Sequence, residues 1–179
     1  MPHAFMHTCL TLGILLATCN HAAIAAEETT ISLADGKIEM VAPADWKKVA
    51  PRVRIIQYEF SVPPAEGDVP GRVTIMGAGG SVEMNLKRWI GQFSATTKNE
   101  TTKEKVAGQE VHVLDIVGTY ADRRGPFAPA VERKGYRMLA AIIVTEKLGK
   151  YFVKFYGPEA TVDKAAKAFH GMIDSLKVK

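Results

Sequence analysis

The first part of the chain has no charged side chains, and cysteine is scarce throughout. Every Lys, Arg, Asp and Glu lies at or beyond Glu27, and the two cysteines are Cys9 and Cys19. No apolar run is long enough to cross a bilayer, which excludes a polytopic membrane protein. Basic residues outnumber acidic ones by only 23 to 19. This small excess is far below the dense basic stripe typical of nucleic-acid-binding proteins.

The uncharged N-terminal segment has the organisation of an export signal. Residues 9–17 form an apolar stretch about as long as the hydrophobic region of a signal peptide. Ala23 and Ala25 supply the small side chains that a signal peptidase needs, so we expect cleavage after Ala25. The segment departs from the usual pattern because its start carries only His3 and His7, with no Lys or Arg. We expect a signal peptide over residues 1–25 and a periplasmic or secreted protein.

Both cysteines fall inside this segment, so the exported protein would have no thiol. That excludes a structural disulfide, a Cys ligand for a metal and thiol catalysis in the remaining domain. Residues 16–19 also come close to a bacterial lipobox, with Thr18 where a smaller residue is usual. Lipidation of Cys19, which would anchor the protein to the cell envelope, therefore remains an alternative to plain secretion.

Residues 26–179 contain no repeat, low-complexity tract or long polar linker, and we expect one globular α+β domain. Residues 29–33 and 37–41 flank Ala34, Asp35 and Gly36, which predicts an N-terminal hairpin. Alternating or continuously apolar patterns predict five further strands at residues 54–62, 72–76, 111–117, 136–144 and 150–156.

Two segments have the periodicity of amphipathic helices. Residues 81–96 follow a glycine-rich turn, with Ser81 as the N-cap, and residues 161–176 follow Gly157 and Pro158, with Thr161 as the cap. We expect residues 96–105, which are polar and charged, to form a surface connection. The whole pattern predicts a largely antiparallel sheet packed by the two helices.

This order of elements resembles that of the PsbP-like superfamily. The resemblance rests on an early hairpin leading to Pro43 and Trp46, on Tyr151, Phe152 and Lys154 before Gly157 and Pro158, and on Phe169 and Leu176 in the last helix. The superfamily includes extrinsic photosystem subunits, Ran-binding proteins of the Mog type and exported bacterial proteins. The resemblance implies a layered α/β sandwich and carries over no catalytic residue.

The best candidate for a functional site is a basic stretch, residues 120–137, that we expect to be mostly loop. Long loops in compact domains are often functional, and cations beside an aromatic ring suit an anionic or protein partner. The residues assigned to this binding site are Arg123, Arg124, Phe127, Arg133, Lys134 and Arg137. We expect a non-enzymatic binding or accessory module without metal, cofactor or nucleic acid.

The alternative function is a small hydrolase or lyase that uses Asp115 or His112 in a cleft. The two residues lie three apart on one predicted strand, so they face opposite sides of the sheet and cannot act as a pair. Asp115 shares a face with apolar neighbours, which predicts a partly buried carboxylate with a raised pKa. Residues 77–81, which precede a helix, lack the spacing of a nucleotide-binding loop.

Overall fold

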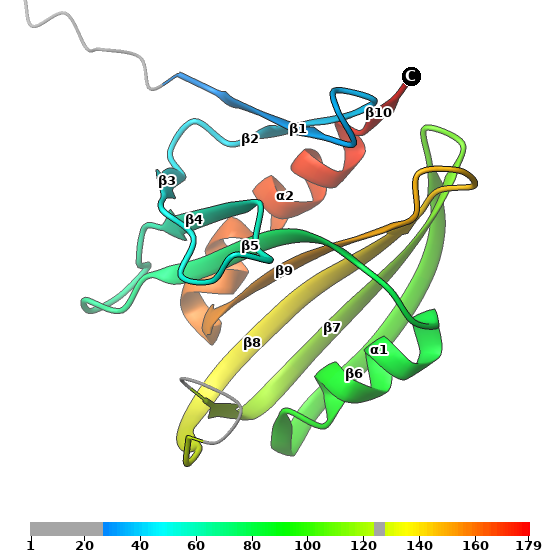
Figure 1. The fold of residues 1–179 in the computed structure, drawn as a ribbon. Helices are drawn as coiled ribbons and strands as arrows, with labels where there is room; N and C mark the ends of the chain where they lie inside the picture. Colours follow the sequence, from blue (N-terminus) through cyan, green and yellow to red (C-terminus); the bar gives the residue numbers. More distant parts are fainter. Residues whose placement is uncertain (1–26, 124–127) are drawn as a thin grey trace, which may run out of the picture.

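The computed structural model describes residues 27–123 and 128–179, which form two antiparallel sheets and two helices (Figure 1). The larger sheet has the strand order β3-β4-β5-β9-β8-β7-β6, and the smaller sheet has the order β1-β2-β10. The elements of the smaller sheet are β1 (Thr29–Leu33), β2 (Ile38–Ala42) and β10 (Lys177–Val178). Those of the larger sheet are β3 (Lys47–Val49), β4 (Tyr58–Val62), β5 (Gly71–Ala78), β6 (Phe93–Val106), β7 (Gln109–Asp122), β8 (Val131–Val144) and β9 (Lys150–Pro158). The helices are α1 (Val82–Ile90) and α2 (Glu159–Asp174).

The predicted fold class is confirmed, including the N-terminal hairpin. Strands β1 and β2 pair antiparallel around a turn in which Ala34, Asp35 and Gly36 all have positive φ. The inward side chains of β2, Ile38 and Met40, are fully buried because the small sheet packs with α2 over one face of the large sheet.

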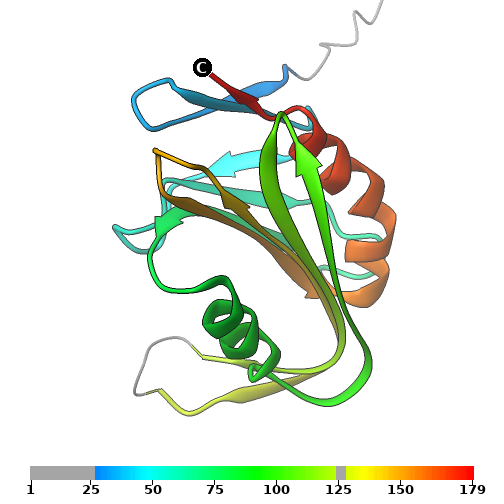
Figure 2. The same cartoon turned by 90° about the vertical axis from the view of Figure 1, so that its right-hand side faces the viewer.

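The two helices cover opposite faces of the large sheet, so the domain has two cores (Figure 2). Phe169 of α2 is fully buried in the first core, where its ring lies 6.1 Å from that of Phe155. Trp89 of α1 is 2% exposed in the second core and meets Phe152 edge-on at 5.1 Å. Phe152 and Phe155 point to opposite sides of β9, as the strand alternation predicts. We call the face that carries α1 the concave face, since the sheet curls around this helix.

The expected surface connection at residues 96–105 is wrong, because this segment lies inside β6. The helix before it is also shorter than predicted: α1 ends at Ile90, Gly91 caps it, and the strand begins at Phe93. β6 is an edge strand whose side chains are almost all exposed, so it lacks the apolar alternation that marks a half-buried strand. The four threonines within it were the remaining signal, since Thr favours strands.

The basic stretch is a hairpin rather than a long loop. β7 continues to Asp122 and β8 begins at Val131, so only residues 123–130 connect them. Other boundaries differ from prediction as well, among them the starts of β4 and α2. Strand β4 starts at Tyr58 instead of residue 54, and α2 starts at Glu159, which places Thr161 inside the helix. Thr161 does not cap α2, and its hydroxyl accepts a hydrogen bond from the backbone N–H of Ala65 at 3.2 Å.

No helix within residues 27–123 and 128–179 combines the length and apolar character needed to cross a membrane.

Candidate binding site on the concave face

A pocket of about 480 Å³ opens on the concave face, at the root of the β7–β8 hairpin. Several segments far apart in the sequence form its walls. Arg52 comes from the connection after β3, Arg72 from β5, and Asp122, Arg133 and Tyr136 from the hairpin. The pocket therefore contains part of the basic stretch that the sequence singles out, together with residues that the sequence does not associate with it.

Glu59 and Arg72 form a buried ion pair in the wall of this pocket. Arg72 donates from Nε to Glu59 Oε1 at 2.8 Å and from Nη2 to Oε2 at 3.0 Å, while Glu59 is 2% exposed. Burial raises the pKa of Glu59, but the hydrogen bonds from Arg72 and from the Arg52 backbone outweigh it and leave that pKa lowered. The carboxylate of Glu59 is thus ionised and largely occupied by Arg72.

Arg72 also holds Tyr156, a further residue of the pocket wall. Its Nη1 donates to the hydroxyl of Tyr156 at 2.6 Å. Tyr156 lies 5.1 Å from the ring of Tyr120, which in turn stacks on Tyr136 at 6.0 Å. A row of tyrosine rings, Tyr156, Tyr120 and Tyr136, thus runs from β9 in the pocket wall to the β7–β8 hairpin.

Lys154 lies two residues before Tyr156 on the same face of β9. Its side chain is half-buried, and its ammonium donates to Gln92 Oε1 at 2.6 Å and contacts the hydroxyl of Tyr120 at 3.4 Å. The ammonium lies 4.8 Å from the centre of the Tyr156 ring and 5.3 Å from that of Tyr120. Burial, and then the nearby charges of Arg72 and Arg88, lower the pKa of Lys154 to about 7.

The predicted binding residues divide into three groups in the structure. Arg133 lines the pocket, with its Nε 3.6 Å from Asp122 Oδ2, and its side chain is 43% exposed. Arg123 and Lys134 are also exposed on the hairpin, and Arg123 donates to the backbone carbonyl of Ala128 at 3.3 Å. Arg124 and Phe127 lie outside the described residues.

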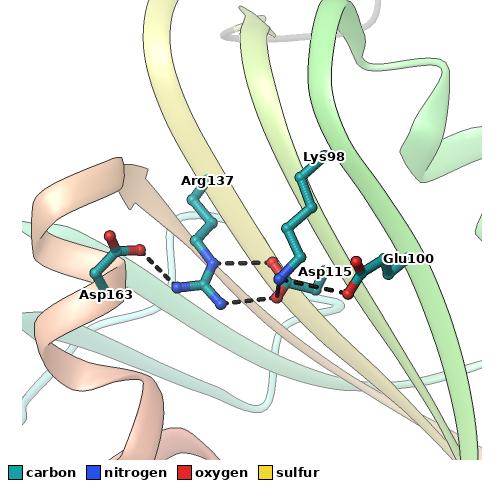
Figure 3. Close-up of polar contacts among 5 residues, drawn as sticks. All are labelled: Lys98, Glu100, Asp115, Arg137 and Asp163. Atoms are coloured by element: carbon teal, nitrogen blue, oxygen red, sulfur yellow. Dashed lines mark hydrogen bonds and ion pairs between the residues drawn. The ribbon is translucent and has the colours of Figure 1, made fainter.

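Arg137 forms the third group, because it lies within β8 on the other face of the sheet (Figure 3). It donates from Nε to Asp115 Oδ1 at 2.9 Å, from Nη2 to Asp115 Oδ2 at 2.7 Å, and from Nη1 to Asp163 of α2 at 2.5 Å. Its assignment to the basic loop is therefore corrected: Arg137 is already bound by two carboxylates and connects α2 to the sheet.

The predicted rise in the pKa of Asp115 is wrong in sign. Burial does raise this pKa, but hydrogen bonds from Arg137 and Lys98 outweigh burial and lower it. Lys98 Nζ lies 2.8 Å from Asp115 Oδ2 and also contacts Glu100 at 3.4 Å (Figure 3). Asp115 is thus an ionised structural carboxylate.

His112 and Asp115 face opposite sides of β7, as predicted, and His112 Nε2 lies 2.6 Å from Glu110 Oε1. His112 and Asp115 do not line the pocket at the root of the hairpin, nor a second pocket between Lys37, Gln109 and the β8–β9 turn at residues 145–148. Residues 27–123 and 128–179 hold no group of three or more His, Cys, Asp or Glu suited to a metal ion. Ser81 caps α1, with its hydroxyl accepting from the backbone N–H of Met84 at 3.1 Å.

Sequence reasoning missed the inner part of the site, namely Glu59, Arg72, Lys154 and Tyr156. The alternating pattern of residues 150–156 predicts a strand but does not show that β9 is central or that α1 packs on the Lys154 side of the sheet. A lysine between two aromatic residues of the same face, Phe152 and Tyr156, was the available signal. Such a pattern indicates an ammonium held among rings.

No protein-family model matches the sequence, and no curated protein matches it either. Solved structures do match the fold. The PsbP protein of the cyanobacterium Synechocystis sp. PCC 6803 is 16% identical, with a TM-score of 0.54 over 92% of this chain and 99% of that one. LpqN of Mycobacterium tuberculosis, described as involved in cell envelope biogenesis, is 10% identical, with a TM-score of 0.56 over 86% of this chain and 91% of that one. The chain therefore has the PsbP-like fold that its sequence resembles.

Proposed function

We propose that this protein is a non-enzymatic binding module of the cell exterior that contacts an anionic partner through the β7–β8 hairpin and the pocket at its root. The single observation that carries the proposal is this pocket, which brings Arg52, Arg72 and Arg133 together from three parts of the chain. A polar pocket beside a long projecting hairpin offers both a concave site and an extended contact surface. Two solved structures share the fold, and one of those proteins has a described role in envelope biogenesis.

The charges of this region favour an anionic partner. Exposed Arg123, Arg133 and Lys134 lie on the hairpin together with two carboxylates, Asp122 and the exposed Glu132, and Asp122 Oδ2 lies 3.6 Å from Arg133 Nε. Clustered cations steer anionic partners and form charge-assisted hydrogen bonds with carboxylates. The hairpin cations are thus available to a partner, whereas Arg137 is not.

The geometry does not favour the enzymatic alternative. A general acid or base must reach a bound substrate with a proton to exchange. Asp115 is instead held ionised between Arg137 and Lys98, and neither of the pockets described above reaches it or His112. We therefore do not assign a catalytic role to either residue.

The proposal is tested with poly-L-glutamate, a defined polyanion, by fluorescence anisotropy at several NaCl concentrations. The test variant combines Arg123→Ala, Arg133→Ala and Lys134→Ala. The control variant combines Lys164→Ala, Lys167→Ala and Lys177→Ala, which removes the same charge from exposed positions on α2 and β10.

The hairpin variant is expected to lose at least tenfold in affinity and to show a weaker dependence on salt, while its melting temperature stays near that of the wild type. The α2 control should bind as the wild type does. Equal losses in the two variants would show that net charge alone governs binding, and the hairpin would no longer be the contact surface.

A further inference from the structure

The ammonium of Lys154 has no carboxylate partner among residues 27–123 and 128–179. Its polar contacts are Gln92 Oε1 and the hydroxyl of Tyr120, both uncharged. The carboxylates on the surrounding strands pair with other cations: Glu59 accepts two hydrogen bonds from Arg72, and Asp122 Oδ2 lies 3.6 Å from Arg133 Nε. Burying a cation without a counter-charge raises the free energy of the folded protein. The protonated form of Lys154 therefore lacks one negatively charged partner on the concave face.

Three charged groups near Lys154, on β5, α1 and β7, act on its protonated form. Arg72 of β5 and Arg88 of α1 disfavour its protonated form, and Asp122 of β7 favours that form more weakly. Tyr120 of β7 and Tyr156 of β9 present their rings to the ammonium. Burial raises the pKa of Tyr120 above its usual value, so this tyrosine stays neutral and supplies no negative charge at physiological pH.

A negatively charged ligand in the pocket could act as the counter-charge of Lys154. Tyr156 and Arg72 line the pocket, and both also lie next to Lys154. A carboxylate placed against the Tyr156 hydroxyl and Arg72 Nη1 would therefore bind a tyrosine whose ring centre lies 4.8 Å from the Lys154 ammonium. Glu59 already pairs with Arg72, so the counter-charge that Lys154 lacks is a single negative charge, which a carboxylate supplies.

We propose that the Arg72–Tyr156–Lys154 cluster is a carboxylate-binding site in which Lys154 becomes protonated when the ligand binds. This inference rests on the proposed function and specifies the chemistry of the group that the pocket accepts. The free protein holds Lys154 with a large neutral fraction near pH 7, and a bound carboxylate supplies the counter-charge that stabilises the ammonium. Binding is then coupled to the uptake of protons from the buffer.

Two sources of the carboxylate are distinguished by two probes. Glutarate represents a free small carboxylate, and a capped hexaglutamate peptide represents an acidic segment of a protein partner. Each is titrated into the protein by calorimetry at pH 7 in Tris and in imidazole. Both buffers carry no negative charge and do not compete for the site, and they differ in ionisation enthalpy.

The observed binding enthalpy is expected to differ between the two buffers by the amount that corresponds to uptake of a fraction of one proton. Lys154→Met should remove this difference and weaken binding about tenfold. Gln92→Glu is a second variant that places a carboxylate against the ammonium, so Lys154 is already charged and proton uptake should vanish. Gln57→Glu adds the same charge at an exposed position and serves as its control.

Binding to the wild type with equal enthalpies in both buffers would overturn the carboxylate site at Lys154. That result would not affect the proposed binding surface on the hairpin, which the poly-L-glutamate measurement tests separately. Binding of neither probe would overturn the inference as well. Proton uptake with the peptide alone would identify an acidic protein segment as the ligand, and uptake with glutarate would identify a small carboxylate.

Discussion

Arg137 and Asp115 form a two-point ion pair across β7 and β8, with Nε–Oδ1 at 2.9 Å and Nη2–Oδ2 at 2.7 Å. The pair lies between two further charges, Lys98 on β6 and Asp163 on α2 (Figure 3). Such a chain joins the edge strand, the two central strands and the helix by charge-assisted bonds. Its role in this fold is therefore the positioning of α2 and β6.

The first prediction concerns this pair and acid. Asp115→Asn should lower the free energy of unfolding at pH 7 by about 1–3 kcal/mol, since the half-buried Arg137 loses one of its two carboxylate partners and keeps only Asp163. The pKa of Asp115 is lower in the folded protein than its ordinary value of 3.8. Its contribution is complete at neutral pH and is lost as the pH falls through this region, because the unfolded chain then binds more protons.

Urea denaturation at pH 7, 5 and 3 measures both effects. The difference between the wild type and Asp115→Asn should be nearly constant from pH 7 to 5 and should shrink at pH 3. Asp174→Asn, at an exposed position near the end of α2, is the control and should change little at any pH. A difference that stays constant down to pH 3 would contradict the lowered pKa.

The second prediction concerns Lys154 and alkali. Its pKa falls from 10.5 to about 7 on folding, so between these values the unfolded chain binds more protons than the folded protein. The free energy of unfolding of the wild type should therefore rise from pH 6 to pH 9. Lys154→Met should be more stable than the wild type at pH 6 and should show a smaller rise. Urea denaturation of both proteins at pH 6, 7.5 and 9 tests this, and parallel profiles would contradict it.

Most helices and strands could be predicted because their apolar side chains lie on a buried face and their polar side chains on a solvent-exposed face. The hairpin turn at Ala34 and Gly36 and the apolar stripes of α1 and α2 are signals of this kind, and each was confirmed. The segment that became β6 has no buried side, because it pairs through its backbone at the edge of the sheet. Its sequence pattern is then that of a polar connection, and side-chain periodicity cannot distinguish the two.

The candidate site was predictable only in its outer part, the exposed cations of the hairpin. Arg123, Arg133 and Lys134 are close in sequence and form a basic cluster that composition alone reveals. Arg72 and Tyr156 meet only because β5 pairs with β9, in a register that aligns these two residues across 84 positions of sequence. No local pattern specifies such a partner. The same reason explains why the partners of Asp115 and Arg137 could not be predicted.

The third prediction concerns two glycines with opposite roles. A Cβ on Gly118 would lie 3.0 Å from the carbonyl oxygen of Ser94 and 3.0 Å from the Cα of Thr96, both backbone atoms of the neighbouring strand. Gly118→Ala should therefore cost about 1–3 kcal/mol, because the strand must move to admit the methyl group. Gly171 lies inside α2 with nothing within 4 Å of its Cβ position.

Gly171→Ala should raise the free energy of unfolding by about 0.5–1 kcal/mol, since alanine favours the helix more than glycine does. Thermal denaturation followed by circular dichroism compares both variants with the wild type. The two midpoints should move in opposite directions. A Gly118→Ala variant with an unchanged midpoint would show that β6 and β7 adapt without cost near their register shift.

The fourth prediction concerns the N-terminal segment and is independent of the binding site. The full chain, produced in a bacterial host, should be cleaved after Ala25, because Ala23 and Ala25 fit the small pockets of a signal peptidase. Mass spectrometry of the exported fraction should find a protein that begins at Ala26. Replacing Ala25 by a bulky residue, Ala25→Phe, should block this cleavage and leave the precursor in the membrane fraction.

The same measurement decides between secretion and a lipid anchor. Lipidation would place the new N-terminus at Cys19 and add the mass of acyl chains, and Cys19→Ser would abolish both. Plain secretion predicts that Cys19→Ser has no effect on the mass or the location of the product, since the residue is removed with the signal peptide. An intact chain that begins at Met1 and stays in the cytosolic fraction would contradict both routes. The partner of the hairpin would then have to be sought inside the cell.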